Sequence, residues 1–284
     1  MKLTFLGTAA ANAYPEAFCK CENCLRAREI GGKSLRKRSA ALVNDDLLID
    51  FGPDIMTAAQ VHNIPLVNVQ HCLQTHPHAD HMDLSHLLSR SPGFGVIGAP
   101  RLNFYASPLT LELADRTFRR DLSGYGLFDE IAEEELNLKL HPVQPYEPFE
   151  IGAYRVIALS ANHSPKNGAY LYVIEKDECS IFYGTDTAVF FDETWQAFRE
   201  HELKFDVVVL DHTYGPEELG SDHLSAHQVA EHAQKMREKG ILKENGRVYA
   251  THIAHEGNPN HAELSEFAGR HGYKIAYDGL VVTT

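Results

Sequence analysis

The chain has 284 residues, a hydrophobic fraction of 44% and a formal net charge of -13 at pH 7. This length and apolar content suffice to bury a substantial core. No apolar run reaches the ~18 residues of a membrane-spanning helix, so no membrane partner is expected. The acidic balance argues against a broad basic surface and therefore against a nucleic-acid partner. The N-terminus starts with a strand pattern and not with a signal sequence, so a cytoplasmic location is expected.

Short strand-type patterns alternate with helical patterns along the whole chain. Strands are predicted at 3–7, 40–43, 46–50, 69–74, 101–105, 154–159, 169–175, 180–184, 206–210 and 247–251. Helices are predicted at 53–62, 82–90, 107–119, 193–201, 225–239 and 261–270. No Pro-, Gly- or Ser-rich linker and no repeat divides the chain, so we expect a single domain over residues 1–284. This mixture predicts an α/β (α+β) fold in which two sheets face each other beneath outer helices.

The segment 107–147 is charged and, after its first helix, irregular in pattern. Its acidic residues Asp129, Glu130 and 133–135 are typical of a solvated face. We expect the segment to be an insertion that lies over the site.

Three of the five cysteines lie close together in a C-x-C-x-x-C motif, at Cys19, Cys21 and Cys24. Three soft ligands at this spacing indicate a structural zinc, which needs a fourth ligand. His255, three residues after His252, is the best candidate, because an H-x-x-H spacing lets the two imidazoles face opposite ways. The alternative interpretation is a reduced surface loop without metal.

The densest motif is H-x-H-x-D-H, formed by His76, His78, Asp80 and His81 directly after the apolar run 69–73. Imidazole suits zinc, manganese or iron, and a carboxylate suits the harder of these cations. A strand-to-helix turn with this many ligand groups can hold two cations side by side. Four groups cannot complete two coordination shells, so further ligands are expected from other strand ends.

Such ligands follow in order along the chain, each directly after a strand-like run. They are His163, Asp186 and His252. Asp50, at the end of another such run, either supports the histidine cluster from behind or is an ordinary strand-end residue.

The order of these residues resembles that of the metallo-β-lactamase superfamily, and the resemblance covers essentially the whole chain. It implies a four-layer αββα sandwich that binds two catalytic cations. The implied ligands are His76, His78 and His163 for one cation, Asp80, His81 and His252 for the other, and Asp186 as a bridge between them.

A set of N-terminal residues points to one subfamily within this superfamily. The set consists of residues 5–8, Pro15, the cysteine motif and residues 27–28. They are similar to the phosphoribosyl 1,2-cyclic phosphate phosphodiesterases of the carbon–phosphorus lyase pathway. In those proteins three cysteines and a late histidine hold a structural zinc, and the positions that match here are Cys19, Cys21, Cys24 and His255. One departure is the stretch 8–14, which lacks glycines expected in that family. The resemblance also implies a homodimer.

The predicted function is hydrolysis of a small, cyclic phosphate diester through a metal-bridging hydroxide, with zinc or manganese as the two cations. His223 precedes a helix whose cap is predicted at Ser225, and it matches the family histidine that acts near the leaving group. Asp80 is expected to accept a proton besides binding metal. Asp211 is a candidate to orient His223 or His252.

Three other functions of the same superfamily stay open. A tRNA 3′-processing endonuclease needs a protruding basic or Gly/Pro-rich arm, which this acidic chain lacks. A thioesterase of the glyoxalase type shares the metal ligands but not the cysteine motif. A non-catalytic binding protein of cofactor biosynthesis would have a degraded site, whereas all seven ligands are present here. The basic run 33–38 is either a phosphate contact or an exposed loop.

Overall fold

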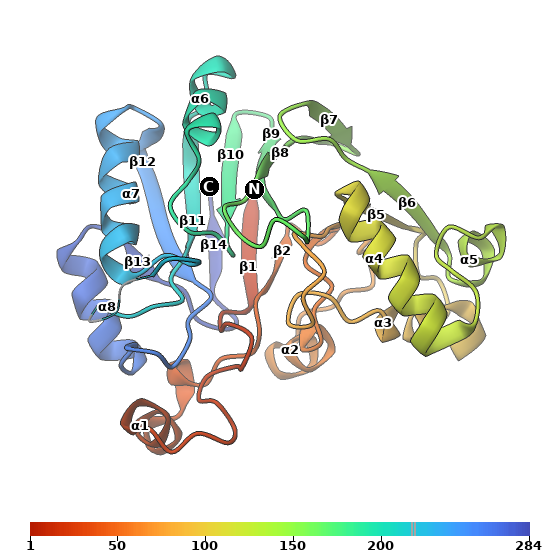
Figure 1. Ribbon diagram of the computed structural model, residues 1–284, viewed down its shortest axis with the longest axis horizontal. Helices are drawn as coiled ribbons and strands as arrows, with labels where there is room; N and C mark the ends of the chain where they lie inside the picture. The colour runs from red at the N-terminus through yellow and green to blue at the C-terminus, as the bar shows by residue number, and fades with distance from the viewer. Residues whose placement is uncertain (217, 219) are drawn as a thin grey trace.

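The computed structural model describes residues 1–216, 218 and 220–284. Two mixed sheets of seven strands each pack against one another (Figure 1). The first sheet contains, in spatial order, β14 (Val281–Thr283), β1 (Lys2–Gly7), β2 (Ala40–Val43), β3 (Leu47–Ile49), β4 (His71–Leu73), β5 (Leu102–Ala106) and β6 (Leu138–Pro142). The second contains β13 (Lys274–Ile275), β12 (Leu242–Thr251), β11 (Phe205–Asp211), β10 (Cys179–Gly184), β9 (Tyr170–Lys176), β8 (Tyr154–Ser160) and β7 (Pro148–Ile151).

Both faces of the central strands are buried. In β9, Tyr172 and Ile174 enter the core between the sheets, whereas Leu171 and Val173 enter the core beneath the outer helices. This alternation follows from the two-residue period of a strand. It explains why the central strands read as continuous apolar runs in the sequence.

The helices form two outer layers, on opposite flanks in Figure 1. The first sheet is covered by α2 (Ile55–His62), α3 (Ser85–Ser89), α4 (Pro108–Phe118) and α5 (Glu130–Glu135). The second is covered by α6 (Asp192–Glu200), α7 (Ala226–Glu238) and α8 (His261–Arg270). A further helix, α1 (Glu22–Ile30), lies at the lower end of Figure 1. The predicted αββα sandwich is confirmed.

The strands that were not predicted from the sequence lie at the edges of the sheets. The four edge strands of the two sheets have at most five residues each; they are β6, β7, β13 and β14. The segment 107–147 is not irregular after its first helix, because it continues through a π-helical turn (Arg119–Ser123), α5 and β6. The predicted helix 82–90 is shortened to α3, since Met82 instead forms a bridge with Phe51.

The strand directions bring the predicted ligands to one edge of the sandwich. β10, β11 and β12 run parallel in the second sheet, as do β3, β4 and β5 in the first. Parallel strands end on the same side, so the loops after β10, β11 and β12 lie together. The loop after β4 in the other sheet meets them, because Nε2 of His81 lies 3.3 Å from Nε2 of His252.

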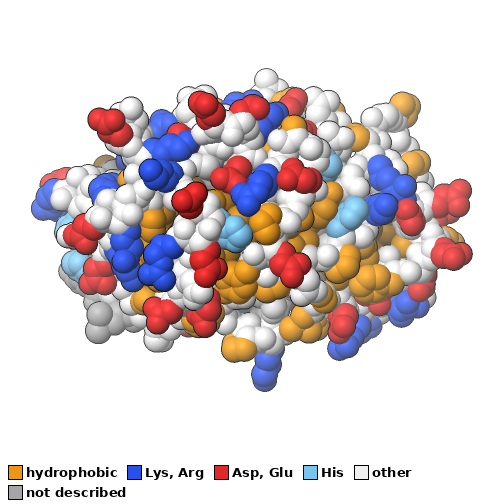
Figure 2. All heavy atoms as spheres, turned by 90° about the horizontal axis from the view of Figure 1, so that it is seen from above, with side chains coloured by type: hydrophobic (Ala, Val, Ile, Leu, Met, Phe, Trp, Pro, Cys, Tyr) orange, Lys and Arg blue, Asp and Glu red, His pale blue; other side chains and the backbone are white. Residues whose placement is uncertain are grey.

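The surface mixes both signs of charge. On the face shown in Figure 2, acidic and basic side chains are interspersed with hydrophobic ones. Among the described residues, none of the helices combines the length and apolarity needed to span a membrane.

Candidate metal centres

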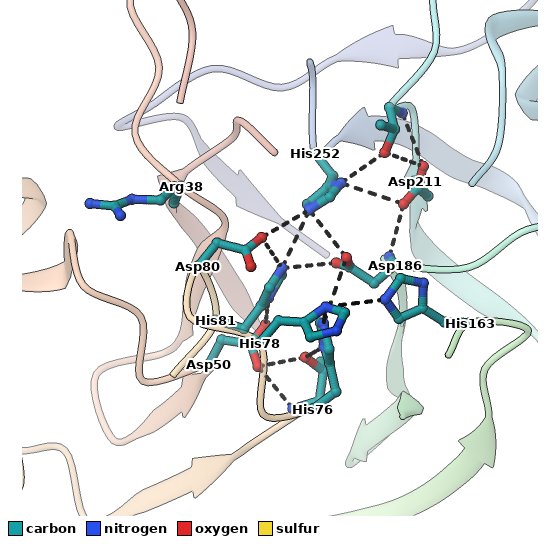
Figure 3. Close-up of polar contacts among 12 residues, drawn as sticks. Arg38, Asp50, His76, His78, Asp80, His81, His163, Asp186, Asp211 and His252 are labelled. Atoms are coloured by element: carbon teal, nitrogen blue, oxygen red, sulfur yellow. Dashed lines mark hydrogen bonds and ion pairs between the residues drawn. The ribbon is translucent and has the colours of Figure 1, made fainter. Parts of the chain in front are cut away.

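All seven predicted catalytic ligands lie in loops at this edge of the sandwich (Figure 3). Four come from the loop after β4, and His163, Asp186 and His252 follow β8, β10 and β12. Asp186 and His252 adopt left-handed backbone conformations, with φ of 56° and 62°, as does Asp50 with φ of 66°. Such conformations are unfavourable for residues with a side chain and are typical of functional sites.

The first ligand group consists of His76, His78 and His163. The Nε2 of His76 lies 2.9 Å from Nδ1 of His78, and Nε2 of His163 lies 3.3 Å from the same atom. Ligand atoms about 2.1 Å from a tetrahedral cation are about 3.4 Å apart, so these nitrogens are spaced as ligands of one ion.

The second ligand group consists of Asp80, His81, Asp186 and His252, all of them buried. Nε2 of His81 lies 3.0 Å from an oxygen of Asp80 and 3.0 Å from Oδ2 of Asp186, and Nε2 of His252 lies 3.2 Å from Oδ1 of Asp186. Oδ2 of Asp186 is fully buried, and the contact with Nε2 of His81 is its one polar contact among the described residues. A cation bound between these two atoms would be a partner for both.

Asp186 connects the two groups. Its Oδ1 lies 3.9 Å from Nε2 of His76 in the first group, while both its oxygens face the second group (Figure 3). The donor set of imidazoles and carboxylates fits two adjacent divalent cations such as zinc or manganese.

The imidazoles are fixed in orientation by contacts on their far nitrogens. Nδ1 of His81 bonds Oδ2 of Asp50 at 2.7 Å, and Nδ1 of His252 bonds Oγ1 of Thr213 at 2.8 Å. Nδ1 of His76 lies 3.0 Å from Oγ1 of Thr75. Contacts of this kind leave the opposite nitrogen of each ring free for a metal.

The electrostatics of the site also favour a cation. Burial opposes a charge on His81, but the carboxylates of Asp186, Asp80 and Asp50 outweigh it and raise the pKa of His81 well above its usual range. Burial and the neighbouring His81 keep the pKa of His76 well below its usual range. Three buried carboxylates around one imidazole therefore leave negative charge that a divalent cation would neutralise.

His223 lies beside both ligand groups. Its ring centroid is 4.9 Å from that of His163 and 5.4 Å from that of His252. Nδ1 of His223 bonds Oδ2 of Asp211 at 2.9 Å. Burial lowers the pKa of His223, but Asp211 outweighs this effect and raises it to about 9.

Asp211 holds several site residues at once. Its Oδ2 also accepts the backbone N–H of Asp186 at 2.9 Å and lies 3.6 Å from Nδ1 of His252, while its Oδ1 accepts the hydroxyl of Thr213. From the sequence, Asp211 was a candidate to orient either His223 or His252. In the structure it lies beside both.

A family model described as a beta-lactamase superfamily domain matches residues 46–253. The chain belongs to the metallo-β-lactamase superfamily. The match runs from the strand before Asp50 to the residue after His252 and so includes both ligand groups. No curated protein sequence matches the chain significantly.

Several solved structures of this superfamily share the fold over the whole chain. A diphosphatase from the PhnP family is 23% identical, with 100% of this chain and 97% of that chain covered and a TM-score of 0.75. Zinc-bound PqqB from Methylobacterium extorquens is 18% identical, with both chains covered to 100% and a TM-score of 0.72. The short form of human tRNase Z is 17% identical, with coverage of 100% and 99% and a TM-score of 0.65.

A further candidate metal centre is the cysteine cluster, formed by Cys19, Cys21, Cys24 and His255. Nδ1 of His255 lies 3.6 Å from Sγ of Cys19 and 3.5 Å from Sγ of Cys21, distances expected between ligands of one tetrahedral zinc. Cys21 also caps α1 by accepting the N–H of Cys24. Burial raises the pKa of Cys21, but this N–H and His255 lower it to about 7, which favours the thiolate.

The basic run 33–38 does not act as one unit. Lys33 lies over the ring of Tyr277, and Arg36 is buried and donates to Oγ1 of Thr8. Arg38 donates to both carboxylate oxygens of Asp54 and points away from the ligand groups in Figure 3. The structure therefore does not place these cations together as one phosphate contact.

Proposed function

We propose that the chain is a dinuclear metal-dependent phosphodiesterase that hydrolyses a small, cyclic phosphate diester. When bound, two divalent cations supply an acidified water and bind the phosphoryl oxygens. The protein would contribute the two ligand groups joined by Asp186. Asp80 of the second group would also accept a proton.

The pair of His223 and Asp211 is the observation that carries the proposal. Because Asp211 occupies Nδ1 of His223, the other ring nitrogen is free to donate a proton to a leaving group. An alkoxide is a poor leaving group that needs this proton. A thiolate, with an ordinary pKa near 8.5, needs it far less, so the pair favours an ester of phosphate over a thioester.

The cysteine cluster is part of the same proposal, as the site of one structural zinc. Three thiolates and one imidazole complete a tetrahedral shell with no open position, as in structural zinc sites. The relative described as a diphosphatase supports phosphate chemistry.

The test is hydrolysis of bis(p-nitrophenyl) phosphate by protein that has been stripped with a chelator and reloaded with zinc or manganese. We expect turnover only after reloading, and loss of turnover in Asp80→Ala. Full activity in Asp80→Ala would contradict the dinuclear mechanism. Absence of turnover in protein shown to hold both cations would instead favour a thioesterase or a binding protein.

A second substrate isolates the role of His223. We expect His223→Ala to lose about 10²–10⁴-fold in kcat on a ribose cyclic phosphate, whose leaving group is an alkoxide, but much less on the nitrophenyl ester. The matched control is His227→Ala, an exposed position on α7 outside both ligand groups. Equal losses on both substrates would show that His223 does not protonate the leaving group.

A further inference from the structure

A cavity of about 570 Å³ adjoins the first ligand group. His78 belongs to both, because its Nδ1 faces His76 and His163 while its ring forms part of the cavity wall. Small-molecule sites range over about 300–1,000 Å³, so the cavity is large enough for an organic group. We call it the substituent cavity.

The substituent cavity is predominantly apolar. Met82 and Leu84 line it and are 8% and 4% exposed, and the half-buried Leu113 and Leu122 line it as well. Leu113 belongs to α4, and Leu122 belongs to the π-helical turn that continues it. An apolar group bound here would be removed from water, which is favourable.

The charges around the cavity are negative. Asp83 and Asp121 are among its lining residues, and none of its lining residues in the described part of the chain is Lys or Arg. Arg120 bonds both oxygens of the Asp121 carboxylate, and it is the one basic side chain paired with Asp121 among the described residues. A carboxylate or a second phosphate held next to Asp83 and Asp121, on the far side of the cavity from the cations, would therefore be repelled.

The cavity is held in place relative to the ligands. Nε2 of His78 lies 2.6 Å from the side-chain amide of Asn167, another lining residue. The backbone carbonyl of Asn167 accepts the hydroxyl of Thr110 in the first turn of α4. α4 is thus tied through Asn167 to a metal ligand, and its position sets the distance between the cavity wall and the first ligand group.

We propose that the substituent cavity binds the organic substituent of the phosphate diester and selects substituents that are uncharged and apolar. This inference rests on the proposed phosphodiesterase function and deepens it. His223 is not among the described residues that line the cavity, so the leaving-group site and the substituent cavity are separate contacts.

The test compares three diesters that share p-nitrophenolate as leaving group and differ only in the other substituent, which is methyl, phenyl or 4-carboxyphenyl. The metal-loaded protein should prefer the phenyl ester to each of the others by roughly tenfold in kcat/KM. Thr117→Lys, which adds a cation to the cavity wall, should raise kcat/KM for the carboxyphenyl ester relative to the phenyl ester by a similar factor.

Two further variants make the result decisive. Glu112→Gln changes the net charge by the same amount as Thr117→Lys on the exposed side of α4 and should leave the ratios unchanged. Leu122→Ala adds no charge and should lower the preference for phenyl over methyl, which keeps the test valid if Thr117→Lys does not fold. Equal kcat/KM for all three esters would overturn the inference and leave the phosphodiesterase function standing. No turnover of any ester by protein that holds both cations would overturn both.

Discussion

Asp50 is not one of the seven proposed ligands but fixes one of them. It is completely buried, and its two oxygens accept hydrogen bonds from His81, from the backbone and hydroxyl of Thr75, and from Gln74. The carboxylate therefore fixes both the ring orientation of His81 and the path of the chain that leads into the ligand loop.

Asp50→Asn should weaken cation binding at the second ligand group by about 10–100-fold, because the amide can no longer accept from all of these donors. Competition with a chromogenic chelator measures this affinity. Asp45→Asn makes the same change at an exposed position nearby and should bind like the unmodified chain. Unchanged affinity in Asp50→Asn would show that His81 does not depend on Asp50.

At the scale of the element, an ion pair attaches the start of α2 to the loop that precedes β2. Asp54 precedes the first residue of α2, and its two oxygens accept from Nε and Nη2 of Arg38 at 2.8 Å each. Burial raises the pKa of Asp54, but Arg38 outweighs it and holds the pKa below its ordinary value of 3.8. The pair is bidentate and partly buried, so it contributes more than a typical surface pair.

Asp54→Asn should lower the free energy of unfolding by about 1 kcal/mol at pH 7. Because the pKa is lower in the folded chain, the unfolded chain binds more protons as the pH falls. The stabilisation is therefore present above pH 4 and is lost as the pH falls through the lowered pKa. Urea unfolding at pH 7 and at pH 3 should show the difference between the two proteins narrow at the lower pH. A constant difference would argue against the ion pair as its cause.

At the scale of the whole molecule, one short segment joins the two kinds of metal centre. His252 belongs to the second ligand group and His255 to the cysteine cluster. Between them, Ile253 donates to the carbonyl of Thr8 and accepts from the N–H of Ala10. The cysteine cluster thus anchors the N-terminal loop against the segment that also presents a catalytic ligand.

Cys21→Ser should remove one zinc per chain and lower the melting temperature by several degrees, since metal binding contributes to folding. Elemental analysis and thermal unfolding measure the two effects. Cys179→Ser makes the same substitution at the start of β10, away from the cluster, and should keep the full metal content. An unchanged zinc content in Cys21→Ser would exclude the cluster as a metal site.

The sequence predicted those parts of the site whose residue types are distinctive. His163 and His252 stand directly after strand patterns, so their placement follows from the fold. Thr75 and Thr213, which orient two of the imidazoles, were not predicted, because threonine at a strand end is common and its partner lies elsewhere in the chain.

The parts of the fold that were missed depend on contacts between distant segments. β13 has two residues and is defined only by its pairing with β12. The substituent cavity arises where α4 packs near the loop 77–84, and no local pattern in either segment encodes that packing. The position of α4 relative to the loop 77–84 is determined by contacts between residues far apart in the sequence.

The pairing of β1 with β14 has a consequence for how the chain folds during synthesis. Lys2 lies opposite Thr283 in that pair, and the amine of Met1 donates to Oγ1 of Thr284. One edge of β1 can pair with β2 early, but its other edge stays unpaired until β14 has been synthesised. His252 and His255 also emerge late from the ribosome, after their partner ligands. Contacts between such distant residues slow folding. The nascent chain therefore completes its first sheet only after β14 has been synthesised, and it brings together the two ligand groups and the cysteine cluster only after His252 and His255 have emerged.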